Sequence, residues 1–281
     1  MNNIFPRVLL IITFISSAFV FCIFLLLAIL CFDLFDSNII NNFFGMVWSV
    51  EEEKYGIILP FLGTLIISIL SLIIAFIFSF CICSYIFLNK YKTINIFLEK
   101  SMLLMASVPT VIYAFAALFT FVPFISTYIN GSSTLSILVA SITLSLLLIP
   151  TMGLLFLNSF RTLSSKYENT CLHLGLSKEQ FFYQFILKNS IPHMLSAVIL
   201  AMARAVGDTM IVLMLAGNAL SMPNSILDSA RSLTSHIALI FANDYSSLSF
   251  KAIFLCAFLL LCSNFILILS IKYIQRKCNA I

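Results

Sequence analysis

Two opposite charges stand four residues apart in an otherwise apolar stretch. The stretch covers residues 201–218 and contains Arg204 and Asp208. A charge at the centre of a bilayer costs about 2.5 to 3.5 kcal/mol on insertion scales, so neither side chain is expected to face lipid. Residues four apart share one face of a helix. We therefore expect each charge partly to neutralise the other while both point into a protein interior or a water-filled path.

The pair has two interpretations. Ionisable groups inside membrane spans usually serve function, which favours a polar path lined by Arg204 and Asp208. The alternative is a structural ion bridge between packed helices, because Ala197, Ala201 and Gly207 would allow those helices to approach closely. We favour the path.

The composition indicates a polytopic membrane protein. Of 281 residues, 62% are hydrophobic and 9% are charged, whereas about a quarter of the residues in a soluble domain carry a charge. The net charge of +4 is spread through short loops, which is how membrane topology is set and not a sign of nucleic-acid binding. The eight cysteines lie mostly in apolar runs. We therefore expect no disulfide framework, no metal site and no cofactor.

Long apolar runs predict an all-α fold with six transmembrane helices, at residues 8–32, 57–88, 102–128, 135–158, 192–218 and 252–271. Residues 33–56 carry five acidic side chains and one lysine, which suits the outside. Residues 89–101, 160–189 and the tail after residue 271 each carry a net positive charge. Positive loops lie on the cytoplasmic side, so both termini are predicted to be cytoplasmic.

This pattern divides the chain into two parts. Residues 1–55 form the first transmembrane helix and an acidic external loop, and residues 56–281 form the main transmembrane domain. Pro60 and Gly63 predict a short lead-in before the second helix. Pro192 is a good first helical position and is expected to open the fifth span.

A polar segment at residues 160–191 is long for a connection without a role. A first short helix is expected to reach Gly175, and Ser177 then caps a second helix, in which Phe181 begins an apolar stripe. Two short helices around a glycine would form a surface knob. The alternative is an amphipathic connector that lies at the membrane interface.

This segment, followed by Arg-Ala-Val-Gly-Asp-Thr at residues 204–209, resembles the coupling loop and fifth helix of the permeases of binding-protein-dependent ABC importers. Residues 203–218 and 230–238 are similar, more narrowly, to the phosphate-specific permeases of the PstC subtype. The likeness covers the chain from about residue 55 to its end. The family's loop motif has a glutamate at the position of Asn169, and here Glu168 stands one residue earlier.

The resemblance implies the type I fold of ABC importer permeases and a place in the bacterial inner membrane. It also implies three kinds of partner: a second, PstA-like permease, an external PstS-like binding protein that delivers phosphate, and two PstB-like ATP-binding subunits. Since the chain has no G-x-x-x-x-G-K-[ST] loop, we expect ATP hydrolysis in those subunits and no enzyme activity here. The residues assigned to coupling with the ATPase are Glu168, Asn169, Gly175, Phe181 and Pro192.

In this picture Arg204 lines the substrate path, together with Asp208 and Thr209. A guanidinium offers several fixed donors, which can replace part of the water shell that phosphate must lose. Asp208 would hold Arg204 in place and limit its affinity, because a site that binds too tightly does not release.

Four further residues are candidates for the path. Arg231 either meets the anion at the external mouth or is simply solvated. Ser107, Thr110 and Tyr113 lie around Pro109, where a kink would present their hydroxyl groups to the path. Hydroxyl groups in membrane spans nevertheless often bond to their own backbone.

Other functions remain open on the sequence. A permease for sulfate, molybdate or tungstate would keep the same architecture and change only the path. A secondary transporter is disfavoured because inverted repeats are not visible and the charged pair lies in a single helix. A membrane-bound enzyme is disfavoured because the sequence shows no recognisable arrangement of nucleophile and base.

Overall fold

A computed structural model describes residues 4–35, 43, 45–49, 54–128, 134–173, 175–243 and 248–279. Its longest helices are α1 (Ile4–Phe35), α3 (Ile58–Leu88), α5 (Thr110–Tyr128), α6 (Ile137–His173), α8 (Leu187–Gly207) and α11 (Leu248–Asn279). The shorter elements are β1 (Trp48–Ser49), β2 (Lys54–Tyr55), α4 (Lys92–Ser107), α7 (Lys178–Gln180), a π-helical turn (Phe181–Ile186), α9 (Met210–Leu215) and α10 (Leu233–Asn243).

The all-α prediction with six spans is confirmed. Within the described residues, six helices are long and apolar enough to cross a membrane. α10 is apolar but too short to be one of them. The six span candidates follow the predicted order along the chain, with boundaries that differ by several residues.

α6 is the central helix of the bundle and packs along α3, α8 and α4. Its Leu144, Leu148 and Phe156 are completely buried. Two hydrogen bonds join it to α3 one turn apart: the Ser79 hydroxyl donates to the Ile149 carbonyl at 3.0 Å, and the Cys83 thiol lies 3.0 Å from the Gly153 carbonyl. Such small side chains let membrane helices approach closely.

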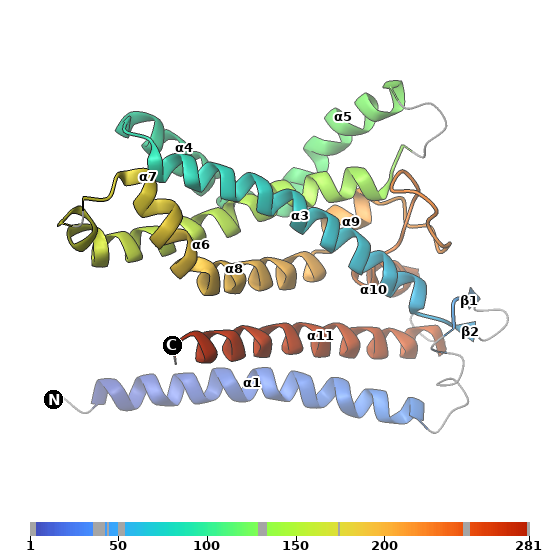
Figure 1. The fold of residues 1–281 in the computed structure, drawn as a ribbon. Helices are drawn as coiled ribbons and strands as arrows, with labels where there is room; N and C mark the ends of the chain where they lie inside the picture. Colours follow the sequence, from blue (N-terminus) through green and yellow to red (C-terminus); the bar gives the residue numbers. More distant parts are fainter. Residues whose placement is uncertain are drawn as a thin grey trace.

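α1 and α11 lie side by side, and α11 packs in turn on α8 (Figure 1). The start of α1 and the end of α11 lie at the same end of the bundle as α4 and α7, while β1 and β2 lie at the opposite end (Figure 1). The exposed apolar face of α1, from Val8 to Ile29, suits contact with lipid.

The second span is one continuous helix that is not preceded by a separate lead-in, so that prediction is wrong. Pro60 is the third residue of α3, inside the first turn, where a missing N–H breaks no helical bond. Gly63 has a different role, because a Cβ there would lie 2.2 Å from the Arg231 carbonyl oxygen. The glycine lets α3 contact the backbone of a distant segment.

The predicted loop at residues 89–101 is also wrong, because α4 occupies most of it. Val108 and Pro109 interrupt the helix, and the chain continues as α5. The residue before a proline avoids the α conformation, and Val108 has an extended ψ of 130°. The third span is therefore α5 alone.

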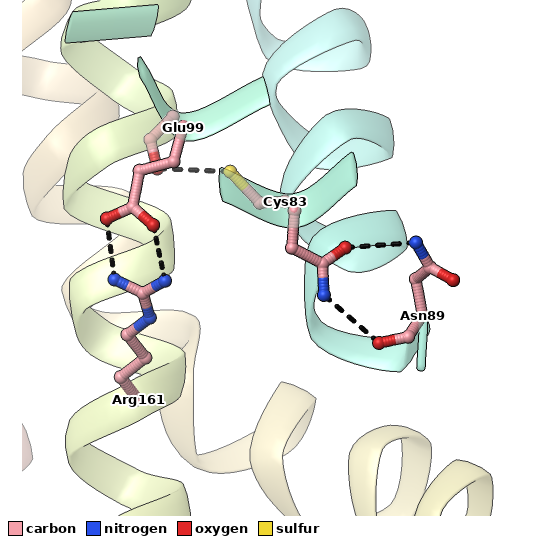
Figure 2. Close-up of polar contacts among 6 residues, drawn as sticks. Cys83, Asn89, Glu99 and Arg161 are labelled. Atoms are coloured by element: carbon pink, nitrogen blue, oxygen red, sulfur yellow. Dashed lines mark hydrogen bonds and ion pairs between the residues drawn. The ribbon is translucent and has the colours of Figure 1, made fainter. Parts of the chain in front are cut away.

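A bidentate ion pair fixes α4 against α6 (Figure 2). The Arg161 guanidinium donates to both Glu99 carboxylate oxygens, at 2.7 and 2.6 Å. This hydrogen bonding lowers the pKa of Glu99. At the turn between α3 and α4, the Asn89 and Asn95 amides bond to one another at 3.0 Å, as Figure 2 also shows.

Candidate functional site

The fifth span is broken where the sequence predicted a continuous helix over residues 192–218. α8 ends at Gly207, Asp208 is extended with ψ of 125°, and α9 begins at Met210. The buried Asp208 carboxylate accepts a hydrogen bond from the Ile211 N–H at 2.9 Å. Asp208 thus satisfies one of the free N–H groups at the start of α9.

The predicted pairing of Arg204 with Asp208 is wrong as a contact. Within the described residues, these two side chains form neither a hydrogen bond nor an ion pair with each other. The Arg204 guanidinium instead donates to the Thr151 hydroxyl of α6, at 2.7 Å. The helix break explains the difference, since a shared helical face requires both residues to be helical.

Arg204 is an exposed cation on a membrane-spanning helix. Its charge acts electrostatically on Tyr113 of α5 and on Asp208. The Tyr113 hydroxyl donates to the Met105 carbonyl at 2.7 Å. An exposed guanidinium at this depth must meet water or another protein chain. The site therefore combines one cation with hydroxyl groups from two neighbouring helices.

Ser107 and Thr110, the two candidates beside Pro109, do not belong to the group around Arg204. The Ser107 hydroxyl donates to the Leu104 carbonyl at 2.8 Å, so it bonds to its own backbone, which was the alternative to a role in the path. Thr110 is the first residue of α5 and is half-buried. Thr209 is half-buried at the α8–α9 break and makes no capping bond with its side chain. Thr151 and Tyr113, which the sequence did not assign to Arg204, are the residues brought near it.

Arg231 lies in a compact segment between α9 and α10. Its Nε donates to the Asn218 carbonyl at 2.9 Å, and Nη1 lies 3.4 Å from Nδ1 of His236. The half-buried side chain is therefore held by protein groups, which argues against the solvated alternative. Burial lowers the pKa of Arg231.

His236 is a buried residue of α10 to which the sequence assigned no functional role. Its ring meets the Trp48 ring edge-on, with 4.3 Å between centroids. Its Nε2 has no partner among the described residues. Burial, and then the charge of Arg231, lower the pKa of His236 to about 3. No spacing in the sequence signals this contact, because Trp48 and His236 are far apart in the chain.

The first half of the segment at residues 160–191 is not the separate short helix that the sequence predicted. α6 continues to His173, so the part of the segment before Gly175, the first arm, is the end of a span. The part after Gly175 is the second arm. Gly175 has a φ of +72°, a conformation that favours glycine, and nothing lies within 4 Å of a Cβ placed there. The sharp turn is as predicted, and Gly175 is exposed at the surface.

The second arm begins as predicted. The Ser177 hydroxyl accepts from the Gln180 N–H and the Gln180 side chain accepts from the Ser177 N–H, which completes a capping box. Phe181 is buried at the start of the π-helical turn, as its apolar stripe predicted. Pro192 does not open the fifth span, because it lies inside α8. The proline removes one hydrogen bond within that helix.

The remaining coupling candidates, Glu168 and Asn169, lie on the first arm, in α6. Glu168 is exposed, and its carboxylate accepts from the Ser164 hydroxyl at 3.1 Å. The Asn169 side chain lies outside the described residues. A small cavity of about 160 Å³ separates Glu168 and Cys171 from Leu176, Lys178 and Phe181. In the described chain, no group of three or more His, Cys, Asp or Glu side chains could hold a metal ion.

Comparison with known proteins agrees with this architecture. Residues 81–279 match the family described as binding-protein-dependent transport system inner membrane component. The probable ABC transporter permease protein YqgH of Bacillus subtilis (strain 168) is 29% identical over 235 residues, which cover 81% of this chain and 74% of the relative. The phosphate transport system permease protein PstC of Pasteurella multocida (strain Pm70) is 27% identical over 210 residues, which cover 68% of this chain and 66% of the relative.

A solved structure supports the fold. The MetNI methionine ABC transporter, in an inward-facing conformation, aligns with a TM-score of 0.61 and 14% sequence identity. The alignment covers 77% of this chain and 93% of that one. At this identity the likeness concerns the fold alone, which is that of an ABC importer permease.

Proposed function

The chain belongs to the family of binding-protein-dependent transport system inner membrane components, and from this premise we propose that it is the permease through which inorganic phosphate enters the cell. At the level of the family, it is a multi-pass protein of the cytoplasmic membrane and the membrane component of an ABC importer. The family implies a substrate-binding protein and ATP-binding subunits as partners. Phosphate as the substrate is the proposal.

Arg204 is the observation that carries the proposal. Its guanidinium is exposed on a spanning helix, makes no direct contact with Asp208, and is oriented by the Thr151 hydroxyl. A planar guanidinium with free donors suits a tetrahedral oxyanion. Relatives named as phosphate permeases, such as PstC of Haemophilus influenzae at 27% identity, favour phosphate among the oxyanions.

The partners follow from the same proposal. The chain would pair with a PstA-like permease, whose surface would complete the path beside Arg204. A PstS-like binding protein would deliver phosphate, and two PstB-like subunits would hydrolyse ATP. The surface around Gly175 is the contact that we assign to an ATP-binding subunit, because it is exposed, its first arm is the end of α6, and its second arm is held by a capping box and by buried Phe181.

The division of the chain and its orientation belong to the proposal too. Residues 1–55 would add one span and an external loop to the transport core at residues 56–281. The end of the bundle that carries α7 would face the cytoplasm, which agrees with the positive charge of residues 160–189.

Uptake of radiolabelled phosphate tests the proposal. The chain and its neighbouring subunits are restored in cells that lack their own high-affinity phosphate system, and sulfate, molybdate and tungstate are added as competitors. We expect phosphate uptake that none of the three competitors reduces. If one of these anions is carried in place of phosphate, the substrate assignment is wrong and the second candidate, another oxyanion, replaces it.

A further inference from the structure

A cavity of about 490 Å³ opens between α6, α8 and α11. Its polar wall is made by six side chains from the three helices: Asn158, Ser159, Thr162, His193, Ser196 and Gln275. It lies toward the end of the bundle where α6 leads into Gly175, which the charge pattern predicts to be cytoplasmic.

The hydrogen-bonding capacity of this wall is only partly used. The Thr162 hydroxyl donates to the Asn158 carbonyl at 2.9 Å, and the Ser196 hydroxyl donates to the Pro192 carbonyl at 2.9 Å. The Ser159 hydroxyl is buried without a partner among the described residues. A buried hydroxyl that lacks a partner is destabilising, so a polar occupant would be stabilised here.

The charge of the wall restricts the kind of occupant. Among the described side chains, neither an acidic nor a permanently cationic one lines the cavity. The unused donors belong to the amides of Asn158 and Gln275, the ring of His193 and the hydroxyl of Ser159. Without a carboxylate, the wall does not repel an anion. Without a lysine or arginine, it does not hold an anion tightly.

The cavity continues the face that carries Arg204. Leu155 and Leu200 form its edge. Leu155 lies four residues after Thr151 on α6, and Leu200 lies four residues before Arg204 on α8, so each is about one turn away on the same helical face. The Arg204–Thr151 contact, the two leucines and the polar wall therefore follow one another along the crevice between α6 and α8.

We infer that this cavity is an inner binding station for the transported oxyanion, distinct from the site at Arg204. The inference rests on the proposed function. The anion leaves the guanidinium, passes the Leu155 and Leu200 pair, and is received by neutral donors before it enters the cytoplasm. Conduction needs sites that bind well enough to accept the substrate and weakly enough to release it. Neutral donors at the exit meet that requirement, whereas a second arginine would not.

The test uses the whole transport complex in proteoliposomes, with radiolabelled phosphate. The double variant Asn158→Leu/His193→Leu removes donors from two exposed positions, and turnover is expected to fall about tenfold, the size of two neutral hydrogen bonds. The external phosphate concentration for half-maximal uptake stays unchanged, because capture occurs at the other end of the path. His193→Gln keeps a donor and retains most of the turnover.

Thr162→Val is the matched control, because it lines the same cavity but its hydroxyl is already bonded to the backbone. It is expected to transport normally. Co-purification and basal ATP hydrolysis show whether each complex has assembled. If the double variant does not assemble, the turnover of Ser159→Ala tests the inner station in its place. A twofold to fivefold loss of turnover in Ser159→Ala supports the station, by the usual size of one hydrogen bond of about 0.5 to 1 kcal/mol.

The outcomes separate the two proposals. Full turnover in the double variant, or an equal loss in Thr162→Val, overturns the inner station and leaves phosphate transport standing. If the unmodified complex transports sulfate, molybdate or tungstate, the same variants are measured with that anion. If it transports none of the four oxyanions, both the proposed function and the station are wrong.

Discussion

At the scale of single residues, the main finding is the partner of Arg204. The side chain donates to the Thr151 hydroxyl, while Asp208 is used by the backbone of α9. Because no carboxylate of the described residues contacts it, the guanidinium keeps most of its donors for a ligand. The role of Arg204 in the substrate path stays a prediction, and the geometry of its side chain supports that prediction.

Replacing Arg204 tests the path directly. Arg204→Ala is expected to lower phosphate uptake about 10-fold to 100-fold, because a hydrogen bond to a charged group contributes about 1.5 to 3 kcal/mol. Arg204→Lys keeps the charge but loses the planar fork, so an intermediate rate is expected. Arg7→Ala, which removes an exposed arginine of α1, is the control. Normal uptake by Arg204→Ala, in an assembled complex, would remove Arg204 from the path.

His236 predicts how stability depends on pH. Its folded pKa of about 3 lies below the ordinary value of 6.5, so the unfolded chain binds the proton more readily. The folded state is therefore increasingly destabilised as pH falls from 6.5 toward 3, by about 2 kcal/mol at pH 5. Thermal unfolding at pH 7.5 and pH 5 measures this effect. His236→Gln should lose it, and an unchanged pH dependence in that variant would contradict the assignment.

At the scale of elements, the positions where helices end control the surface assigned to coupling. α6 continues from the centre of the membrane bundle to His173, and Gly175 turns the chain into the Ser177 capping box. A helix is stiff over this length, so movement of the turn is carried directly into the span. This continuity is a better basis for coupling than two short, separate helices.

Substitution at Gly175 should uncouple ATP hydrolysis from transport. Its φ of +72° costs a non-glycine residue about 1 to 2 kcal/mol, while the empty space around it excludes a clash. We expect phosphate transported per ATP hydrolysed to decrease in the order Gly, Asn, Ala, Val, because asparagine tolerates positive φ better than the others. ATP hydrolysis and uptake are measured in the same proteoliposomes. An equal ratio for Gly175→Val and the unmodified complex would exclude this role.

At the scale of the whole molecule, the segment between α9 and α10, together with the first residues of α10, joins parts of the chain that are distant in sequence. Thr64 of α3 accepts from the Leu233 N–H at 2.9 Å, and the Ser229 hydroxyl donates to the Leu135 carbonyl at 2.9 Å. The Thr234 hydroxyl donates to the Asp208 carbonyl at 3.0 Å. The segment thereby fixes the end of the bundle opposite α7 and holds the break after Gly207 in place.

Gly63→Ala tests this arrangement. The added methyl group would lie 2.2 Å from the Arg231 carbonyl oxygen, which belongs to backbone and cannot rotate away. We expect a loss of about 2 kcal/mol or more in the free energy of unfolding, as for other overpacked sites. Gly207→Ala is the control, because nothing lies within 4 Å of a Cβ there. Equal thermal stability of the two variants would show that the contact is absent.

The class of protein, the number and order of the spans, and the Gly175–Ser177 turn could all be predicted from the amino-acid sequence. Each of these depends on local properties: the length of an apolar run, the φ that glycine allows, and a capping bond between residues three apart. The folded arrangement was needed to show that Arg204 contacts Thr151, that His236 packs on Trp48, and that a polar cavity lies between α6, α8 and α11. Those contacts depend on how the helices are rotated against one another and on where they break, and hydropathy does not encode either.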